Sequence, residues 1–213
     1  MDILAYGATA LGAYLLGSIP TGFLVARARG VDIRAAGSGN IGATNVMRIL
    51  GRPAGIAVLV VDGLKGFAAC AWLCDLVAAA FQVPEAQVNG LRILAAVAAV
   101  LGHNFTCWLH FRGGKGIATS AGAYFALAPL AAGIALGVWT VMLVLGRYVS
   151  LASIAAAVAL PTAVWLTKGL VLGIVTSVLG LMAIWKHRGN IERLLKGTER
   201  RIGRPPHAQG AAK

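Results

Sequence analysis

The sequence of 213 residues is poor in charged side chains, and especially poor in acidic ones. Asp and Glu together number 7, and charged residues make up 12 % of the chain, whereas hydrophobic residues make up 58 %. The mean hydropathy is +0.78. A soluble domain of this length cannot bury so much apolar surface, while a bilayer supplies the missing apolar solvent. The composition therefore argues against a separate soluble domain and predicts one integral membrane domain.

Cysteine is also scarce. Cys70 and Cys74 lie one helical turn apart in an apolar run, and Cys107 stands alone. This spacing is not that of a metal site, and small buried hydrophobic residues account for it. The first apolar run has no basic residue before it and is longer than the core of a signal peptide. We therefore expect neither a metal site nor a cleaved leader.

Basic residues outnumber acidic ones, with 19 Lys and Arg and a net charge of +12. A nucleic-acid-binding domain would interleave these residues with exposed aromatic side chains in a polar segment, and the sequence has no such segment. The basic residues lie instead between apolar runs, as they do in the cytoplasmic loops of membrane proteins. We expect the lipid bilayer as a partner and no nucleic acid.

Six apolar runs are candidates for membrane spans. They are 3–26, 54–80, 93–111, 117–146, 149–167 and 170–185. As one helix, the fourth run would be about 45 Å long at 1.5 Å per residue, whereas the hydrocarbon core is about 30 Å thick. Pro129 lies inside this run and favours a break. We expect the short helix before the break to be buried in protein.

The distribution of basic residues distinguishes six spans from seven. With six, the basic loop after the first span and the basic tail after Trp185 would lie on opposite sides of the membrane. With seven, they share one side, which should be cytoplasmic, and only Arg92 and Lys168 lie on the other.

The sequence thus predicts an all-α integral membrane protein of about seven transmembrane helices. The N-terminus lies outside, the C-terminus is cytoplasmic, and one short broken helix pair lies near Pro129. Residues 1–203 form a single transmembrane domain, and 204–213 form a polar tail that we expect to be disordered.

Two glycine-rich polar loops interrupt this apolar pattern. The first reads GSGNIGATN from Gly37 to Asn45 and runs into a helical pattern that contains Arg48; the second reads FRGGKGIATS and contains Lys115. Glycine lets successive N–H groups converge, and a following helix N-terminus completes an anion site. The second loop lacks the spacing G-x-x-x-x-G-K-[ST], so it does not predict ATP binding.

Ordinary turns that allow close helix crossing would also explain each loop alone. Two such loops on one face, each with its own cation, favour phosphate.

Further polar groups lie where they can reach the same face. His187 and Asn190 in KHRGNIERLL are three residues apart and share one side of a helix, although most charges of this segment suit a membrane surface. Ser153 begins a span from the same side, although such serines usually bond to their own helix.

Four of the polar residues inside the predicted spans bear on the site. Asp62 and Lys65 are three residues apart in the second span, so we expect them to pair or to face a wet cavity. A supporting role for this pair is at least as well founded as a catalytic one. His103 and Asn104 are similar, since a single histidine in a span is more often a hydrogen-bonded packing residue than a base.

Taken in chain order, seven segments resemble the motifs of one family. The segments LLGSIPTGFLVAR, GSGNIGATN, DGLKG, GHNF, FRGGKGIAT, RYVSLAS and KHRGNIERLL resemble those of the bacterial acyl-phosphate:glycerol-3-phosphate acyltransferases, the PlsY family. The resemblance covers almost the whole chain up to Gly203, and the combination of motifs is specific to this family. It implies a seven-span enzyme of the bacterial cytoplasmic (inner) membrane whose active site faces the cytoplasm.

The resemblance also implies a reaction. A fatty acyl group passes from acyl phosphate to the 1-hydroxyl of glycerol 3-phosphate, giving lysophosphatidic acid and inorganic phosphate, with no cofactor and no metal. The substrate phosphate is thought to assist deprotonation, so a protein base is not required. The soluble enzyme that makes acyl phosphate is a further possible partner.

The family motifs assign roles to residues of this chain. Those expected to be catalytic are Ser38, Arg48, Lys115, His187 and Asn190. Those expected to bind substrate or phosphate are Gly37, Gly39, Asn40, Thr44, Asn45, Gly113, Gly114, Gly116 and Ser153. Those expected to be structural or supporting are Asp62, Lys65, His103 and Asn104.

Three alternatives remain open from the sequence. Broken helices and intramembrane charges also suit a transporter for an organic phosphate anion, but the polar groups cluster on one face and not at the midplane. A non-catalytic membrane subunit would leave both loops unexplained. An acyltransferase that uses acyl-CoA lacks a clear adenine-binding feature here, and neither G-x-S-x-G nor H-x-x-x-x-D occurs.

Overall fold

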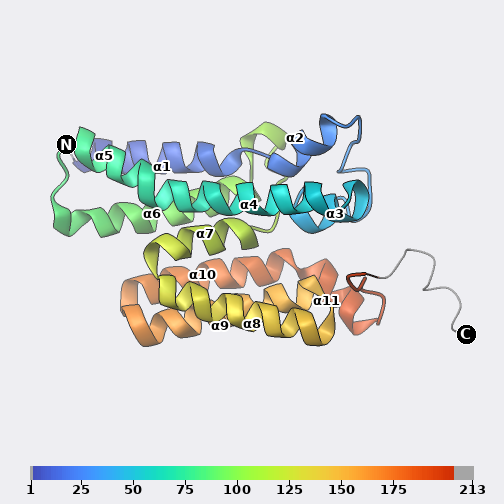
Figure 1. Cartoon of the computed structure of the whole chain (residues 1–213). Coiled ribbons are helices and arrows are strands. Elements are labelled where there is room, and N and C mark those ends of the chain that lie inside the picture. The colour runs from blue at the N-terminus through green and yellow to red at the C-terminus, as the bar shows by residue number, and fades with distance from the viewer. Residues whose placement is uncertain (1, 204–213) are drawn as a thin grey trace, which may run out of the picture.

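The computed structural model describes residues 2–203, and all regular secondary structure among them is helical (Figure 1). The predicted tail 204–213 lies outside the described residues. The elements are α1 (Asp2–Ser18), α2 (Thr21–Arg27), α3 (Ala43–Leu50), α4 (Arg52–Ala68), a π-helical turn (Ala69–Leu73), α5 (Cys74–Ala80), α6 (Glu85–Asn104), a 3₁₀ turn (Cys107–Leu109), α7 (Ile117–Leu127), α8 (Pro129–Gly146), α9 (Val149–Lys168), α10 (Leu170–Lys186) and α11 (Arg188–Leu195).

The long helices form two groups with the short helix α7 between them (Figure 1). Helices α1, α4, α5 and α6 make one group, and α8, α9 and α10 make the other. Helix α7 packs on α4 and α6 in the first group and on α8 in the second. It therefore joins the two groups at the centre of the molecule.

The all-α membrane architecture is confirmed, and its span count stays a prediction. Within residues 2–203, five helical segments are long and apolar enough to cross a membrane: Ile3–Arg27, Arg52–Ala80, Glu85–Leu109, Pro129–Gly146 and Val149–Lys168. A sixth is added if α10 and α11, which are bent by 56°, are taken as one span. Helix α7 has 11 residues, fewer than the roughly 20 that a bilayer requires.

The predicted break at Pro129 is confirmed. Helix α7 ends at Leu127, and Pro129 is the first residue of α8, where its missing N–H would have had no helical partner. Phe125 is the one exposed residue of α7, at 39 %. The short helix is thus covered by protein, as a segment too short to span lipid must be.

Helix α7 approaches α4 closely because glycines lie at their crossing. A Cβ added to Gly66 would collide with the carbonyl oxygen of Thr119, and one added to Gly122 would collide with that of Gly63. Small residues of this kind let two transmembrane backbones touch. This contact fixes the second glycine loop, which precedes α7, against α4.

The first predicted span is a single membrane segment, but its helix is interrupted. Helix α1 ends at Ser18, and α2 begins at Thr21, after Pro20. The carbonyl groups freed by the break find partners inside the protein: Thr106 Oγ1 donates to the oxygen of Ser18 at 2.5 Å, and Lys65 Nζ donates to that of Ile19 at 2.9 Å. Interruptions at membrane depth require such partners.

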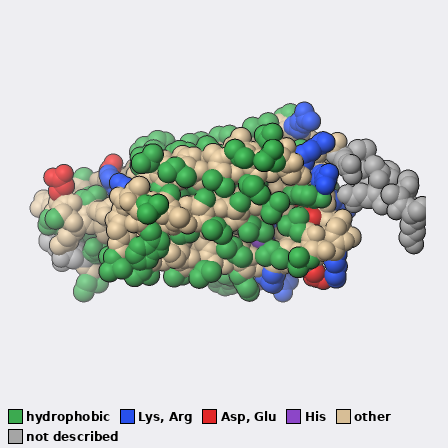
Figure 2. Space-filling view, turned by 90° about the horizontal axis from the view of Figure 1, so that it is seen from below, with side chains coloured by type: hydrophobic (Ala, Val, Ile, Leu, Met, Phe, Trp, Pro, Cys, Tyr) green, Lys and Arg blue, Asp and Glu red, His purple; other side chains and the backbone are tan. Residues whose placement is uncertain are grey.

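Basic side chains are unevenly distributed along the molecule (Figure 2). Hydrophobic side chains are spread over its length, and Lys and Arg side chains gather mainly at one end. That end holds the segment between α2 and α3, the loop before α7, and α11 (Figure 1). Both glycine loops therefore lie at the basic end.

Candidate active site

One cavity joins the two groups of helices at the basic end. Its volume is about 320 Å³, and its lining includes both glycine loops, Arg48 of α3, and residues of α7 to α11. The end nearest the loops is polar. The remainder runs between α7, α8, α9 and α10 and is lined mostly by apolar side chains. A cavity with these two parts suits a molecule with an anionic head and a hydrocarbon chain.

Asn45 organises the first loop. Its side-chain amide donates to the carbonyl oxygens of Ile33, Ala36 and Asn40, and its Oδ1 accepts the N–H of Ser38 at 2.9 Å. Asn40 Oδ1 accepts the N–H of Gly42 at 2.8 Å. These bonds hold the loop over the start of α3.

The second loop is held against the end of α6. Gly113 N–H donates to the carbonyl oxygen of Asn104 at 3.2 Å, and Gly114 N–H donates to that of His103 at 3.0 Å. A Cβ on Gly114 would collide with His103 Nε2. The amides of Gly113 and Gly114 therefore bind α6. The phosphate cradle expected of this loop stays a prediction, and the first N–H groups of α7, which have no partner within the helix itself, are the backbone groups that could bind an anion.

Lys115 belongs to a network that reaches the C-terminal segment. Its Nζ donates to Asn190 Oδ1 of α11, while Asn190 Nδ2 donates to Glu199 Oε1 at 2.7 Å. Ser150 of α9 and Arg193 also donate to the Glu199 carboxylate, at 2.8 and 2.7 Å. Residues far apart in the sequence thus hold the amino group of Lys115 in one place.

Burial shifts the pKa values in this network. Burial lowers the pKa of Lys115 to about 8, although the charge of Glu199 opposes this. Burial raises the pKa of the Glu199 carboxyl, but hydrogen bonds from Asn190, Arg193 and Ser150 outweigh burial and bring the pKa below its usual range. At neutral pH, Lys115 is therefore a cation and Glu199 an anion.

Arg48 supplies the second cation of the cavity. Its side chain is exposed, and its guanidinium makes no hydrogen bond or ion pair with any described residue. Ser38 and Thr44, which flank it in the lining, are likewise without a side-chain hydrogen bond within residues 2–203. These groups can take up an anion without first breaking an internal bond.

His187 lies where α10 meets α11, with its side chain turned into the cavity lining. Its Nδ1 lies 2.8 Å from the carbonyl oxygen of Ala183, which can only accept, so Nδ1 carries the hydrogen. Burial lowers the pKa of His187 to about 4, and the charge of Lys115 adds to this. The ring is therefore neutral at pH 7, and its Nε2 is an acceptor.

Asp62 and Lys65 form the expected buried pair, with their charged atoms 2.8 Å apart. Thr21 Oγ1 also donates to Asp62 at 3.0 Å, and Lys65 caps the broken helix described above. His103 Nδ1 is 3.7 Å from Asp62, beyond hydrogen-bond distance. These contacts tie α4 to the break between α1 and α2, and the supporting role expected of the pair stays a prediction.

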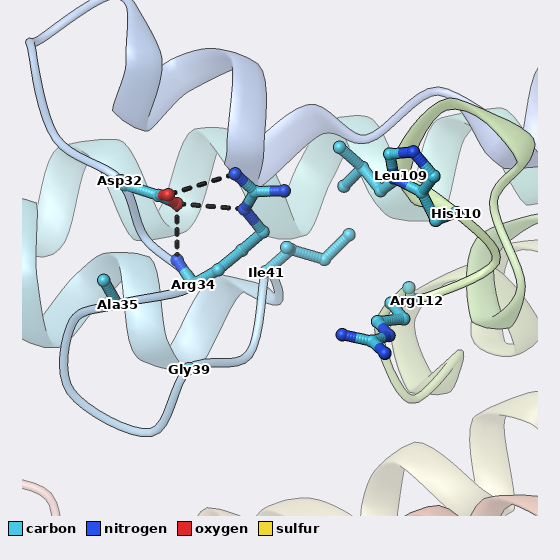
Figure 3. Close-up of a pocket in the computed structure, with 9 residues that line it drawn as sticks. Asp32, Arg34, Ala35, Gly39, Ile41, Leu109, His110 and Arg112 are labelled. Atoms are coloured by element: carbon cyan, nitrogen blue, oxygen red, sulfur yellow. Dashed lines mark hydrogen bonds and ion pairs between the residues drawn. The ribbon is translucent and has the colours of Figure 1, made fainter.

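A second, more open cleft lies on the outer side of the two loops (Figure 3). Its volume is about 700 Å³, and it contains Gly39, Gly113 and Arg112 but none of the residues expected to be catalytic. Arg34, which faces this cleft, is held in a two-pronged pair by Asp32, with both N···O distances 3.0 Å. The smaller cavity is therefore the candidate active site.

The structure brings most predicted site residues into that cavity. Those that line it are Ser38, Asn40, Thr44, Asn45, Arg48, Lys115, Gly116, Ser153, His187 and Asn190, with Asp62 and His103 beneath. Gly37, Gly114, Lys65 and Asn104 are not in its lining, and Gly39 and Gly113 line the outer cleft. Ser153 accepts a hydrogen bond from Trp139 Nε1 at 3.3 Å.

Sequence reasoning missed Glu199, Ser150 and Trp139. The segment KGTER was interpreted as part of a basic surface tail, yet Glu199 is 5 % exposed. A single acidic residue within this basic segment was the available signal. Within residues 2–203 no group of three or more His, Cys, Asp or Glu side chains could hold a metal ion.

Comparison with known proteins identifies the family of this chain. The family model described as glycerol-3-phosphate acyltransferase matches residues 7–197. The chain belongs to this family. A glycerol-3-phosphate acyltransferase of Geobacter metallireducens is 53 % identical over 194 residues, covering 90 % of this chain and 94 % of the relative. One of Geotalea daltonii is 49 % identical over 191 residues, covering 89 % and 93 %.

Two solved structures of the membrane acyltransferase PlsY (YgiH) are similar to this member of the family. The glycerol 3-phosphate form has a TM-score of 0.80 at 39 % identity, and it is matched over 92 % of this chain and 94 % of that one. The lysophosphatidic acid form has a TM-score of 0.77 at 38 % identity, with the same coverage.

Proposed function

We propose that this glycerol-3-phosphate acyltransferase takes its acyl group from acyl phosphate and transfers it to the 1-hydroxyl of glycerol 3-phosphate. The products are lysophosphatidic acid and inorganic phosphate. The observation that carries the proposal is the single cavity in which two cations and an apolar arm meet. Both substrates bear phosphate, and one also bears a hydrocarbon chain, so the cavity matches the pair.

The two cations divide the task of binding phosphate. Arg48 has a free guanidinium, which can hold two phosphate oxygens at once. Lys115 is at the start of α7, whose N-terminal N–H groups add to its positive potential. Ser38 and Thr44 donate hydroxyl hydrogens to the same anions. This charge also stabilises the phosphate that leaves during the reaction.

The reaction itself exchanges one C–O bond for another. The glycerol oxygen forms a bond to the acyl carbonyl carbon, and the bond from that carbon to the phosphate oxygen breaks, with the electron pair leaving on phosphate. Acyl phosphate is already activated, so holding the two substrates in contact supplies much of the rate. No covalent acyl-enzyme is required.

The hydroxyl proton goes to phosphate and not to His187. Burial and the charge of Lys115 lower the pKa of His187 to about 4, below the second pKa of a phosphate ester, which is about 6. Phosphate is therefore the stronger base of the two. His187 instead orients the acceptor, because its Nε2 can accept a hydrogen bond from the attacking hydroxyl.

The basic end of the molecule faces the cytoplasm in this proposal, and the membrane is the bacterial inner membrane. Glycerol 3-phosphate then reaches the cavity from water and acyl phosphate from the membrane side. A soluble enzyme that makes acyl phosphate would act directly before this one. Family membership favours this reaction over transport of an organic phosphate.

A direct assay tests the proposal. Purified protein receives palmitoyl phosphate and labelled glycerol 3-phosphate without metal, and palmitoyl-CoA replaces the acyl phosphate in a parallel sample. We expect labelled lysophosphatidic acid from acyl phosphate alone and none with Lys115→Ala. Product from palmitoyl-CoA alone would overturn the proposed donor. Absence of product from both, in folded protein, would overturn the reaction and call for a vesicle exchange assay.

A further inference from the structure

We propose that the hydroxyl pair of Tyr124 and Thr176 closes the apolar arm of the cavity and sets the length of the fatty chain that the enzyme prefers. This inference rests on the proposed function, because it assigns the arm to the acyl group of the donor.

Helix register gives the depth of the arm. On α10 the lining begins beside His187 and continues through Ala183 and Gly180 to Thr176, and on α9 it runs from Ser150 to Pro161. From its first to its last residue, each stretch rises by eleven residue steps along the helix, or about 16 Å at 1.5 Å per residue. The arm therefore reaches well into the membrane-spanning part of the bundle.

Small side chains keep the arm open. Ala132 and Ala135 line it from α8, Ala156 and Ala157 from α9, and Gly180 from α10. Protein interiors are otherwise close-packed, so small side chains at these positions leave room for an occupant that larger side chains would fill. A hydrocarbon occupant suits this apolar room, and the arm is continuous with the phosphate-binding end.

The far end of the arm is closed by a hydrogen-bonded pair. Tyr124 Oη donates to Thr176 Oγ1 at 2.7 Å, and Thr176 Oγ1 donates to the Leu172 oxygen at 2.5 Å. Tyr124 and Thr176 are 0 % and 1 % exposed. Beyond them Ala131, Val164 and Leu172 belong to the packed core, so no space continues past the pair.

The depth of the apolar arm gives the length of the acyl chain that it can hold. A hydrocarbon chain with C–C bonds of about 1.5 Å advances about 1.3 Å per carbon when extended, so about a dozen carbons reach the pair. A longer chain must bend or leave sideways between Leu59 of α4 and Leu136 of α8, which line the same cavity and are exposed to the membrane. The two routes predict different responses to substitution.

Two variants change the arm in opposite directions. The double variant Tyr124→Val, Thr176→Val removes the ring and both hydroxyl groups together, so neither is left without a partner. Ala157→Leu places a larger side chain midway along the arm. Thr167→Val is the matched control, since Thr167 Oγ1 donates to the Ala163 oxygen at 2.7 Å, as Thr176 does to Leu172, but Thr167 does not line the cavity.

The measurement is kcat/KM for decanoyl, lauroyl, myristoyl, palmitoyl and stearoyl phosphate at saturating glycerol 3-phosphate. The double variant should raise the ratio of stearoyl to lauroyl phosphate about tenfold, since it admits about two further buried methylene groups. Ala157→Leu should lower the ratio by a similar factor. The KM for glycerol 3-phosphate should stay unchanged in both, and Thr167→Val should leave the whole profile unchanged.

The possible outcomes distinguish failure of the chain-length inference from failure of the proposed function. Folded wild-type protein that acylates glycerol 3-phosphate with none of the five donors would overturn the proposed function. Active variants with an unchanged length profile would overturn this inference alone and show that the chain leaves between α4 and α8. If the double variant does not fold, the profile of Ala157→Leu decides in the same way.

Discussion

At the scale of single residues, the charge of Lys115 predicts the alkaline limit of activity. Because the pKa of Lys115 is lowered to about 8, its amino group is mostly protonated at pH 7 and loses its proton as the pH rises through 8. We expect kcat/KM for glycerol 3-phosphate to fall about tenfold per pH unit above that point. In Lys115→Arg the limit should move upward, because guanidinium stays protonated.

A pH series with both proteins at constant ionic strength checks this prediction. Lys115→Ala should lose at least about a hundredfold in kcat/KM at pH 7, since one charged contact to the transition state is removed, and the difference from wild type should shrink above pH 8. An alkaline limit in the same place in wild type and Lys115→Arg would assign it to another group.

Glu199 makes a second prediction at this scale. Glu199→Gln removes the charge that holds Asn190, Ser150 and Arg193, so we expect a loss of about 1–3 kcal/mol of stability and a fall in kcat as Asn190 loses its anchor. Glu192→Gln is the control, because Glu192 is exposed and its bond to Lys196 at 2.6 Å joins two solvated groups. Equal melting temperatures for the two variants would contradict this account.

The residues that sequence reasoning found and missed differ in a physical way. Short sequence motifs contain Arg48, Lys115 and His187, and the residue types in these motifs already indicate phosphate binding. Glu199 accepts a hydrogen bond from Ser150, which is 49 residues away in the sequence. No local sequence pattern indicates such a contact. The bonds of the Gly113 and Gly114 amides to α6 depend in the same way on how a loop lies against another helix.

At the scale of elements, the second loop packs so closely against α6 that adding one methyl group to the loop, at Gly114, should lower activity. Gly114→Ala drives a Cβ into the ring of His103, so the loop and Lys115 must shift. A misplacement of about 1 Å can cost on the order of a hundredfold in rate. We expect kcat/KM for glycerol 3-phosphate to fall by about this factor in protein that still folds. Gly133→Ala, where a Cβ meets nothing within 4 Å, should retain full activity.

A break in a helix could be predicted from the sequence only where the apolar run was longer than one membrane span. The run 117–146 was too long for one span, and Pro129 marked the break that the structure has. The interruption at Pro20 was not predicted, because its run had the length of one span. It persists because Thr106 and Lys65 satisfy the freed carbonyl groups, and these partners come from α4 and the segment after α6.

At the scale of the whole molecule, the basic end holds the first glycine loop, the cavity mouth and α11. Lys168 is the last residue of α9, and the turn from α9 to α10 lies at the opposite end of these helices (Figure 1). If α7 and α8 together cross the membrane twice, Lys168 is outside and Lys196 is cytoplasmic. Cysteine labelling tests this arrangement. In a background without Cys70, Cys74 and Cys107, a membrane-impermeant maleimide added to intact spheroplasts should label Lys168→Cys.

The companion variant Lys196→Cys should react only after the membrane is permeabilised, because basic segments are retained in the cytoplasm. Both positions are exposed in the structure, so folding does not hide either from the reagent. If instead Lys196→Cys is labelled in intact spheroplasts and Lys168→Cys only after permeabilisation, α7 does not complete a crossing, and the chain has an even number of spans between its outer N-terminus and its tail. Asn190 and Glu199 would then lie across the membrane from Arg48 and Lys115, so the cavity that all four line could not form.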